Sequence, residues 1–520
     1  MKIVTAEEMR QIDRACIEGG TPASVLMENA GKAVAEATRG YLGALEEENI
    51  LCLIGGGNNG GDGLVAARYL HEWGATVNAC LCWRRSTDDE NLRLARESGI
   101  TCTDAAADGS LEHVLPLLSD ATCIIDGLLG TGNARPLDAL FKQVLEAVRA
   151  EQEKRPVTVI AIDMPSGMDA DTGACDPACP EADLTVTLAF AKPGLFGMPG
   201  AARVGRLVVA DIGIPEELAD TIRTELMTDD WAAETLPQRP IDANKGTFGK
   251  LLAVAGSVNY TGAAYLACAG ALRSGTGLVT LATAASLQPV IAAMQAEVTH
   301  LPLPESPPGH IAADAVDIIK NEAGKYTALL AGCGLGQDPG TVDFVRGLAA
   351  SGLKMPLVLD ADALNGIAGV PDWWKTLPDC ILTPHPGELS RLCGLSIEEI
   401  QANRLETARK YAGEWLKIIV LKGAYTIVAG ADGRCRISPF ANAALASGGT
   451  GDVLAGIIGG LAAQGLPLFE AASLGVYLHG ATAARLSSEY GDTGLLASDL
   501  LPELPVTIHD LKNDTGPEES

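Results

Sequence analysis

Short apolar runs alternate with longer segments of helical periodicity along both halves of the chain. In the first half the runs are Ile50–Ile54, Thr76–Cys82, Thr122–Asp126, Val157–Asp163 and Val204–Asp211. Runs of this kind, bounded by Gly, Asp or Pro, are typical of strands that are buried on both faces of a parallel sheet. The pattern therefore predicts an α/β domain built on a mostly parallel sheet.

A second set of alternating elements follows a polar, acidic stretch. Its apolar runs are Lys250–Ala255, Leu278–Thr283, Ala328–Ala331, Leu357–Asp360, Cys380–Leu382 and Ile418–Leu421. We therefore predict two α/β domains, residues 1–214 and 242–510, with residues 215–241 as the region that links them.

The N-terminus and the most apolar stretch of the chain both indicate helices. Thr5 and Glu8 have the spacing of a capping box, and Thr21–Pro22 is typical of the start of a second helix. The stretch Val453–Phe469 is short for a bilayer span and contains Gln464, so we expect a buried helix there. The first residues also lack the basic start and apolar core of a signal peptide.

The net charge and the cysteine content of the chain exclude some classes of binding partner. The chain has 38 basic and 66 acidic side chains, a formal net charge of −28. Nucleic acids and anionic membranes select clustered Lys and Arg, so this balance argues against both as partners. The 13 Cys form no CxxC pair, which argues against a zinc ribbon and is typical of buried residues in a reducing compartment. We expect a cytoplasmic protein and, because acidic α/β enzymes often assemble, a homo-oligomer.

A glycine-rich turn, GGGNNGGDG at residues 55–63, follows the first predicted strand. Its glycines satisfy the GxGxxG pattern of dinucleotide-binding folds. Such folds usually place an acid after the second strand, where this chain has Trp83-Arg84-Arg85, a sequence suited at best to a 2′-phosphate. The Asn and Asp of the turn suit a cation or a polar substrate better than a bare pyrophosphate. A turn without any ligand is the simpler alternative.

Two further strand ends carry an Asp in a glycine-rich loop, in residues 126–132 and 163–169. The carboxyl ends of parallel strands share one edge of a sheet, so we expect Asp62, Asp126 and Asp163 to converge there. Each Asp alone is more simply interpreted as a helix cap.

Together these segments resemble the NAD(P)H-hydrate epimerase domain, which has a Rossmann-like fold. The segments are GGGNNGGDG, DGLLGTG and AIDMPSGMDADTG, preceded by TPASVLMENAG, and the resemblance covers about residues 1–214. It implies that Asp163 is catalytic and that Asn59, Asp126 and Ser166 hold a potassium ion, for which hard oxygen ligands are suited. The implied substrate-binding residues are Asn58, Asn59, Gly60, Gly61, Asp62, Gly130, Thr131, Gly132, Asn133, Ala134, Arg135, Pro136 and Asp163. Asn133-Ala134 departs from the family pattern of an aliphatic residue followed by a small polar one.

In the second domain, residues 446–452 (ASGGTGD) run directly into an apolar helical pattern. Consecutive backbone N–H groups at a helix N-terminus form a site for phosphate. The chain has no GxxxxGK[ST] motif, so this is not a P-loop. Asp452 beside such a site suits removal of a proton from a hydroxyl group that attacks phosphorus. An ordinary glycine-rich helix start with Asp in its first turn remains the alternative.

Other loops of this domain carry polar residues just after predicted strands. Lys422–Thr426 (KGAYT) suits a nucleotide edge, and Thr383–Glu388 (TPHPGE) holds His385 between two prolines in a rigid loop. Glycine-rich loops at residues 256–264 and 332–336 permit close approach of a ligand.

With KGTFGKLLAVAGS near residue 245, these motifs resemble the ribokinase-like superfamily, and more narrowly its NAD(P)H-hydrate dehydratase domain, over about residues 245–504. Thr383 stands where that family usually has Asn. The resemblance implies ADP as co-substrate, with ATP used by eukaryotic relatives, and Mg²⁺ fits because phosphates usually need it, with Glu388 as a nearby acid. The implied substrate contacts are Ala263, Gly334, His385 and Asp452. The implied ADP contacts are Lys422, Gly423, Ala424, Tyr425, Thr426, Asn442, Ser447, Gly448, Gly449, Thr450 and Gly451.

The two resemblances imply one purpose, the repair of hydrated nicotinamide nucleotides. The first domain would interconvert the R and S forms of hydrated NADH and NADPH. The second would dehydrate the S form at the expense of ADP, giving AMP and phosphate, with Asp452 as the base. The alternatives are a ribokinase-type kinase of a small alcohol, a non-enzymatic nucleotide-binding module in the first half, and an NADP dehydrogenase.

Overall fold

The computed structural model describes residues 1–86, 88–107, 109, 111–131 and 137–513. The chain divides into two compact units, Met1–Arg223 and the residues from Thr224 onward. Each unit is an α/β domain, as the alternation of apolar runs predicts. The boundary lies within residues 215–241, the stretch expected to link the domains.

The first unit is built on one sheet with the strand order β3-β2-β1-β4-β5-β6-β7, and every pairing between these strands is parallel. Its strands are β1 (Asn49–Ile54), β2 (Thr76–Leu81), β3 (Thr101–Asp104), β4 (Cys123–Gly127), β5 (Thr158–Ile162), β6 (Leu184–Leu188) and β7 (Arg206–Ala210). Its α-helices are α1 (Ala6–Glu18), α2 (Ala23–Leu42), α3 (Asn58–Glu72), α4 (Glu90–Glu97), α5 (Val114–Asp120) and α6 (Ala139–Lys154).

Side chains from the two faces of this sheet pack into two separate apolar cores. Along β1, Ile50, Cys52 and Ile54 pack into one core with residues of α2, α3 and α4, whereas Leu51 and Leu53 pack into another with α5 and α6. Successive side chains of a strand point to opposite faces, so the uninterrupted apolar run is explained by helices on both faces.

The N-terminal helix packs onto this sheet domain through a third apolar cluster. The predicted capping box of α1 is present, with Thr5 and Glu8 each accepting a backbone hydrogen bond from the other residue. Met9 and Ile12 of α1 pack with Leu26 of α2 and with apolar residues around β7. This places α1 beside the carboxyl ends of the strands, where it contributes to the first site below.

The second unit contains a longer sheet, with the order β11-β10-β9-β12-β13-β14-β15-β16-β17-β8. It is parallel except where β16 pairs with β15 and β17. Its strands are β8 (Thr224–Leu226), β9 (Lys250–Val254), β10 (Leu278–Ala284), β11 (Thr299–Leu303), β12 (Ala328–Ala331), β13 (Leu357–Leu359), β14 (Cys380–Leu382), β15 (Ile418–Leu421), β16 (Ile427–Ala429) and β17 (Cys435–Ile437).

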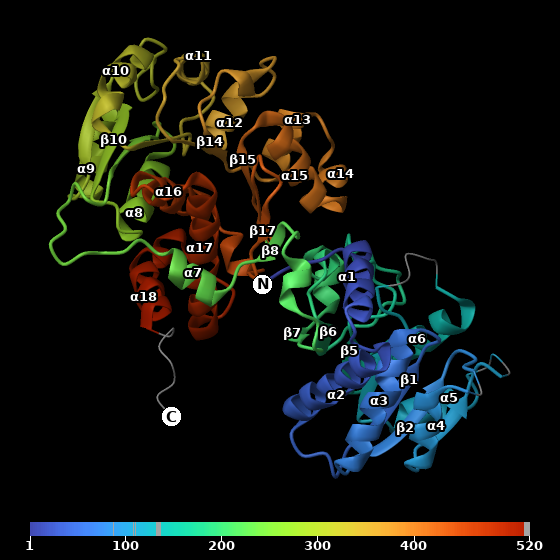
Figure 1. The fold of residues 1–520 in the computed structure, drawn as a ribbon. Helices are drawn as coiled ribbons and strands as arrows, with labels where there is room; N and C mark the ends of the chain where they lie inside the picture. Colours follow the sequence, from blue (N-terminus) through green and yellow to red (C-terminus); the bar gives the residue numbers. More distant parts are fainter. Residues whose placement is uncertain (87, 108, 110, 132–136, 514–520) are drawn as a thin grey trace. The chain divides into compact units, whose positions relative to one another are not determined.

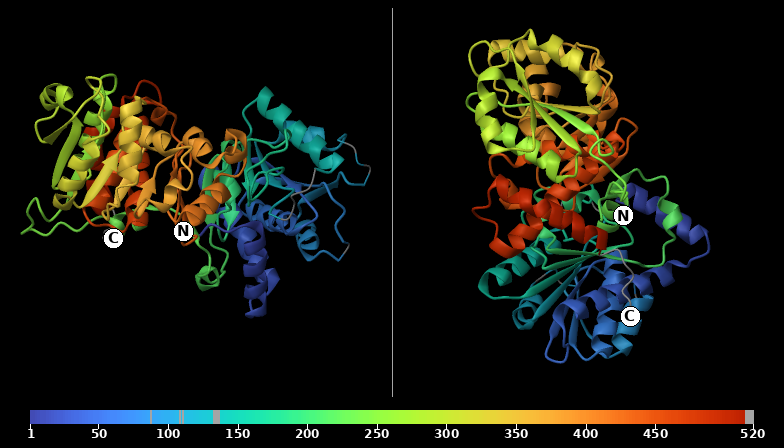
Figure 2. Two further views of the ribbon diagram at one scale, coloured as in Figure 1. Left: turned by 90° about the horizontal axis from the view of Figure 1, so that it is seen from above. Right: turned by 90° about the vertical axis from the view of Figure 1, so that its left-hand side faces the viewer.

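Helices lie on both faces of this sheet as well (Figure 1, Figure 2). They are α7 (Asp229–Thr235), α8 (Thr261–Arg273), α9 (Gln288–Met294), α10 (Ala315–Glu322), α11 (Pro339–Ala349), α12 (Ala361–Ile367), α13 (Pro386–Cys393), α14 (Ile397–Ala402), α15 (Arg404–Trp415), α16 (Thr450–Ala463), α17 (Leu468–Tyr490) and α18 (Leu500–Asn513).

Two segments differ from the sequence-based expectation in detail. The apolar stretch 453–469 is not one helix: it holds most of α16, which ends at Ala463, and only the first two residues of α17, because Gly465 adopts a φ of +93° and Pro467 precedes the second helix. Within residues 215–241, β8 pairs with β17, and Trp231 of α7 packs edge-on against Tyr477 with ring centroids 6.4 Å apart. Part of the expected linking region is therefore an integral part of the second sheet domain.

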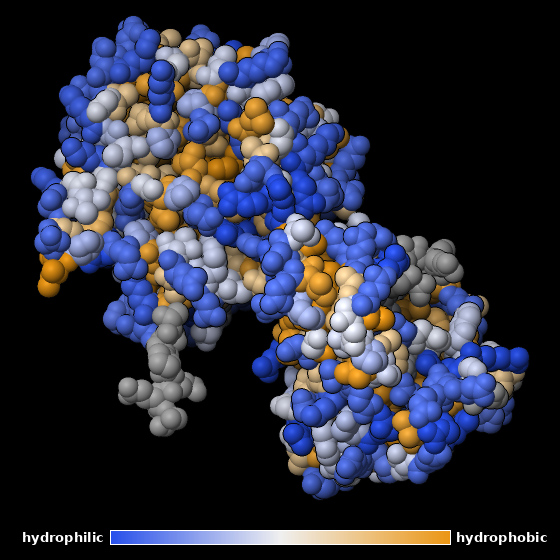
Figure 3. All heavy atoms as spheres, viewed as in Figure 1, coloured by the Kyte–Doolittle hydropathy of each residue, from blue (hydrophilic) through white to orange (hydrophobic). Residues whose placement is uncertain are grey.

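The face of the molecule drawn in Figure 3 is largely hydrophilic, with apolar side chains scattered over it. A search of the described residues for a helix long and apolar enough to span a bilayer finds none.

Two candidate active sites

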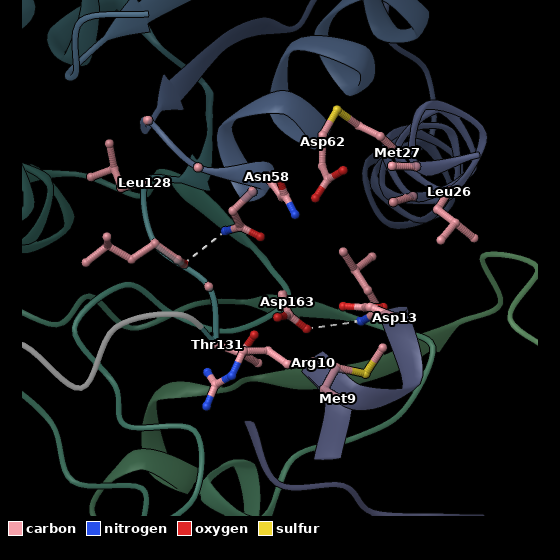
Figure 4. A pocket seen from close by; sticks show the side chains of 18 of the residues that line it. Met9, Arg10, Asp13, Leu26, Met27, Asn58, Asp62, Leu128, Thr131 and Asp163 are labelled. Atoms are coloured by element: carbon pink, nitrogen blue, oxygen red, sulfur yellow. Dashed lines mark hydrogen bonds between the residues drawn. The ribbon is translucent and has the colours of Figure 1, made fainter. Parts of the chain in front are cut away.

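A cavity of about 830 Å³ lies at the carboxyl edge of the first sheet (Figure 4). Its lining includes Asn58, Asn59 and Asp62 from the start of α3, Gly130 and Thr131 after β4, and Asp163 after β5. These sequence-predicted substrate residues thus meet around one cavity, whereas Gly60 and Gly61 of the same turn do not line it. Residues 132–136, which were also predicted to contact substrate, lie outside the described residues.

Asp163 forms a buried ion pair with Lys192. Lys192 Nζ lies 2.5 Å from Asp163 Oδ1 and also donates to Thr187 Oγ1 and to the Leu188 carbonyl. Only 1% of Lys192 is exposed, so the pair is held away from solvent, where an unpaired charge would be strongly destabilising. Asp163 has a φ of +67°, an unusual backbone conformation for a non-glycine residue and typical of functional sites.

Asp62 faces this pair from the other wall of the cavity (Figure 4). The residue is 5% exposed, and its carboxyl group has no hydrogen-bond partner among the described residues. Burial raises the pKa of Asp62 well above its usual value, and the charges of Asp163 and Asp13 raise it further, against a smaller opposing effect of Arg85. The cavity therefore brings a carboxyl group with a raised pKa close to a lysine-bound carboxylate.

Asp126, Asn59 and Ser166 form a second polar cluster. Ser166 donates to Asp126 through its hydroxyl (2.6 Å) and its backbone N–H (2.8 Å), and its Oγ accepts from Leu129 N–H. Asn59 Nδ2 donates to the carbonyls of Leu129 and Ile162 at 2.9 and 3.0 Å. A carboxylate, a hydroxyl, an amide and two carbonyls thus gather here, a donor set of hard oxygens that fits an alkali cation.

The glycine-rich turn is held by Arg85 in place of the acid of a dinucleotide fold. Arg85 Nη1 donates to the carbonyls of Gly55 (2.6 Å) and Gly57 (3.3 Å), and its Nε pairs with Asp89. Its guanidinium is therefore engaged with the protein, which leaves it poorly available to a 2′-phosphate. A Cβ on Gly60 would lie 2.1 Å from the Gly55 carbonyl oxygen, so the turn requires glycine there. Gly61 packs against Met27 in the same way.

In the second unit, the glycine-rich turn leads directly into α16, as predicted. Gly449 adopts a φ of +95° at the N-cap, and Asp452 lies in the first turn of the helix. Burial raises the pKa of Asp452 to about 6, with the negative charge of Asp360 as the next contribution. Asp452 is therefore largely ionised near neutral pH but close enough to its pKa to accept a proton.

Asp360, at the end of β13, is bound by Lys422. Lys422 Nζ lies 2.7 Å from Asp360 Oδ1 and 3.7 Å from Glu388 Oε2, and Thr383 donates to the same Asp360 oxygen at 2.6 Å. Lys422 was predicted as a nucleotide contact, whereas here it links two carboxylates beside Gly451, whose Cβ position is 3.8 Å from Nζ.

His385 and Glu388 cap the start of α13 together. His385 Nδ1 accepts from the N–H of Gly387 at 3.0 Å, and Glu388 Oε2 accepts from the N–H of His385 at 2.8 Å. The ring is therefore rigidly held while half of its side chain is exposed, as the two flanking prolines predict.

The remaining predicted substrate residues lie on neighbouring loops. A Cβ on Gly334 would be 2.6 Å from Cβ of Ala263, so these two residues are adjacent. Cys333, next to Gly334, is grouped with Asp360 and Asp452, with their ligand-type atoms within 4.8 Å of one another. Ala263, Gly334 and Asp452 therefore lie around the same edge of the sheet.

The predicted ADP contacts come from two loops at this edge. Gly423 packs over Arg404, whose guanidinium donates to the carbonyls of Leu421 and Lys422. Asn442 hydrogen-bonds Ser487. Of the others, Ala424, Tyr425 and Thr426 follow Gly423, whereas Ser447, Gly448 and Thr450 belong to the turn before α16.

Several residues of these sites were missed by the sequence analysis. Lys192 and Asp13 line the first cavity, and Asp360 is the lysine-bound carboxylate of the second site. Buried His479, whose Nε2 has no hydrogen-bond partner among the described residues, is close to Lys422 and forms a backbone hydrogen bond with Thr450. Burial lowers its pKa to about 4, so it is neutral.

The chain contains two α/β domains, and each has a lysine-bound carboxylate at the carboxyl edge of a parallel sheet. One of them also has a turn of the kind that binds phosphate. These features define an enzyme that acts on nucleotides. Residues 23–194 match the family of the YjeF-related protein N-terminus, and residues 251–506 match that of NAD(P)H-hydrate dehydratase.

Full-length relatives define the family. The bifunctional NAD(P)H-hydrate repair enzyme Nnr of Moorella thermoacetica is 41% identical over 99% of this chain and 98% of its own length. That of Escherichia coli is 33% identical over 95% of this chain and 91% of its own length. A solved structure of the ADP/ATP-dependent NAD(P)H-hydrate dehydratase from Bacillus subtilis is 34% identical, covering 55% of this chain and 98% of its own, with a TM-score of 0.48. The chain belongs to the family of bifunctional NAD(P)H-hydrate repair enzymes.

Proposed function

We propose that the first cavity epimerises the hydrates of NADH and NADPH and that the Asp452 site dehydrates the S form with ADP, giving AMP and phosphate. The observation that carries this assignment is common to both sites: an Asp with a raised pKa beside a lysine-bound Asp. Family membership over nearly the whole chain supports the pairing of the two activities.

In the hydrate, a hydroxyl group is bonded to C6, beside the ring nitrogen. Inversion at C6 follows when the C6–O bond breaks, the nitrogen lone pair forms a double bond to C6, and water adds from the other face. Protonated Asp62 gives its proton to the departing hydroxyl, and the Asp163 carboxylate, oriented by Lys192, takes a proton from the incoming water. The opposed positions of the two carboxyl groups around the cavity support this division of roles.

Potassium would be held by Asn59, Asp126 and Ser166. Its charge would neutralise Asp126 and fix the loops after β4 and β5 relative to α3. The carbonyls of Leu129 and Ile162, which already converge on Asn59, support this ligand set.

In the second site, Asp452 takes the proton of the C6 hydroxyl as that oxygen attacks the terminal phosphorus of ADP. The N–H groups of Gly448–Gly451 stabilise the charge of the transferring group. Phosphate is then a good leaving group: the C6–O bond breaks with help from the ring nitrogen, loss of a C5 proton follows, and the reduced nicotinamide is restored. His385, Ala263 and Gly334 would contact the hydrated ring.

ADP would be bound by residues 422–426 and by the turn before α16. Mg²⁺ bound with its phosphates would find a hard oxygen ligand in Asp360, and Glu388 would act on it through water, which leaves Asp452 to act as the base. We also propose that the protein is cytoplasmic and forms a homo-oligomer. The free state of all 13 cysteines supports a reducing compartment.

The decisive experiment follows recovery of NADPH from a mixture of both hydrate epimers by its absorbance near ~340 nm, a property of the reduced nicotinamide that hydration removes. The reaction is run with ADP, with ATP and without nucleotide. Complete recovery that requires nucleotide supports both activities. A plateau at the fraction of the S epimer contradicts the assignment of epimerisation to the first cavity, and no recovery contradicts the assignment of the Asp452 site.

A further inference from the structure

Trp83 forms an aromatic wall of the first cavity. The residue directly follows β2, is 49% exposed, and packs against Phe141 of α6 with ring centroids 5.9 Å apart. A Cβ on Gly56 would lie 2.3 Å from Trp83 Cδ1, so only a glycine permits the indole to lie against the glycine-rich turn. The contacts with Gly56 and Phe141 hold a large exposed ring in a fixed position. Solvated surfaces rarely need such a ring, whereas ligand sites do.

Trp83 and the proposed reacting centre lie at different strands of the sheet. Trp83 follows β2, Asp163 follows β5, and β1 and β4 lie between these strands. Three strand spacings of about 4.8 Å separate them by about 14 Å along the sheet edge. This spacing separates the two backbones, and the indole lies against the Gly56 turn, so a nicotinamide ring at Asp163 leaves Trp83 available to another part of a ligand in the same cavity.

The start of α3 lies between these two positions, because it follows the central strand β1. Gly57, the N-cap of this 15-residue helix, has no side chain that could accept a hydrogen bond from the first backbone N–H groups. Gly57 and Asn58 line the cavity, and Arg85 holds the turn in place through the carbonyls of Gly55 and Gly57. Groups of this kind bind phosphate.

We propose that Trp83 stacks on the adenine of the hydrated dinucleotide in the epimerase site. The features along the sheet edge then follow the order of the groups in the dinucleotide. The Trp83 ring would contact adenine, the start of α3 would contact the diphosphate, and Asp62 and Asp163 would contact the hydrated nicotinamide. This subsite rests on the proposed function of the first cavity. Arg85 is already bound to the turn and to Asp89, and stacking on the base does not need a 2′-phosphate, so the hydrates of NADH and NADPH should both use this subsite.

The test combines a variant with a truncated substrate in the full-length chain. Trp83→Ala should raise the KM for epimerisation of hydrated NADH about tenfold, with kcat little changed, since stacking of one base on an aromatic ring has effects of this order. Trp83→Phe should retain most of the affinity. For hydrated reduced nicotinamide mononucleotide, which lacks adenosine, Trp83→Ala should leave KM unchanged. An equal increase for both substrates, or no increase for the dinucleotide, overturns the proposal.

Two controls test whether a change in KM is due to the Trp83 ring. Dehydration of the S hydrate by the same variants reports folding of the chain and should be unchanged. Trp73→Phe, at the other end of α3 where the ring packs under Arg39, should leave both KM values unchanged.

A binding measurement decides the subsite even if the cavity does not epimerise. ADP-ribose contains adenine and diphosphate but no nicotinamide, and it should quench tryptophan fluorescence in the native protein more than in Trp83→Phe. Equal quenching in the two proteins overturns the subsite. Failure of the native chain to epimerise either hydrate instead contradicts the proposed function of the cavity.

Discussion

Both sites contain a buried aspartate paired with a lysine, although the residues around the two pairs differ. In the first, Asp163 is bound by Lys192 at 2.5 Å, and in the second, Asp360 is bound by Lys422 at 2.7 Å. Each pair lies just beyond the carboxyl ends of parallel strands. In both domains a lysine therefore pairs with one buried aspartate beside the place where chemistry is proposed.

The sites differ in the carboxyl group beside that pair. Asp62 is almost completely buried and has no described hydrogen-bond partner, so its pKa is raised well above the ordinary value. Asp452 is less buried, and its pKa rises only to about 6. The comparison shows how burial, together with the neighbouring charges, raises the pKa of two aspartates to different extents, which suits one to donate a proton and the other to accept one at the same pH.

The largest effect should come from Asp452→Asn. Loss of the base should lower the dehydration rate by about 10³-fold, because general-base catalysis contributes on this scale. Epimerisation, measured by chromatographic separation of the hydrates, should be unchanged. Loss of both activities in a folded variant would contradict the presence of separate sites.

The matched change in the first domain is Asp62→Asn, which retains the shape of the side chain but removes the proton donor. We expect epimerisation to fall about 10²-fold while dehydration of the S hydrate is unchanged. A variant with normal epimerisation would show that Asp62 only positions substrate.

Opposite pH profiles should distinguish the two aspartates. The rate of dehydration should increase as pH rises through about 6, since ionised Asp452 is the active form. Epimerisation should instead decrease at high pH, as Asp62 loses its proton. Asp13→Asn removes one of the charges that raise the pKa of Asp62, so it should shift that decrease to lower pH. Parallel profiles in the two assays would contradict the contrast.

A smaller effect is expected from Ser166→Ala, which removes one proposed potassium ligand. The potassium concentration that gives half-maximal epimerisation should rise about tenfold. Epimerisation by the native chain that is equally fast in sodium and potassium would argue against the cation site.

The strands that carry the sites were predicted well because they are buried on both faces and read as continuous apolar runs. Six strands were missed: β3, β6, β8, β11, β16 and β17. Leu184–Leu188 (β6) is buried between β5 and β7, but its Leu and Val alternate with Thr, so it does not form a continuous apolar run. Thr101–Asp104 is short and polar at the sheet edge, and Ile427–Ala429 and Cys435–Ile437 belong to a short antiparallel extension of a parallel sheet. Such segments depend on neighbours in space, which local sequence does not reveal.

Some site residues could be identified from local sequence, and others could not. Asp163 and Asp452 were identified because they stand in distinctive motifs. Lys192 was missed because it is 29 residues from Asp163 and meets it only when β5 and β6 lie side by side. The pairing of Asp360 with Lys422, 62 residues apart, likewise depends on the assembled sheet.

The strand β8 has a practical consequence for experiments that separate the two activities. A fragment that begins at residue 242 would lack this strand and so expose the backbone edge of β17, a surface prone to aggregation. It would also lose the ion pair of Arg436 with Glu225 and the packing of Trp231 on Tyr477. A cut between Arg223 and Thr224 keeps these interactions, so it is the better place to divide the gene for independent expression of the two halves.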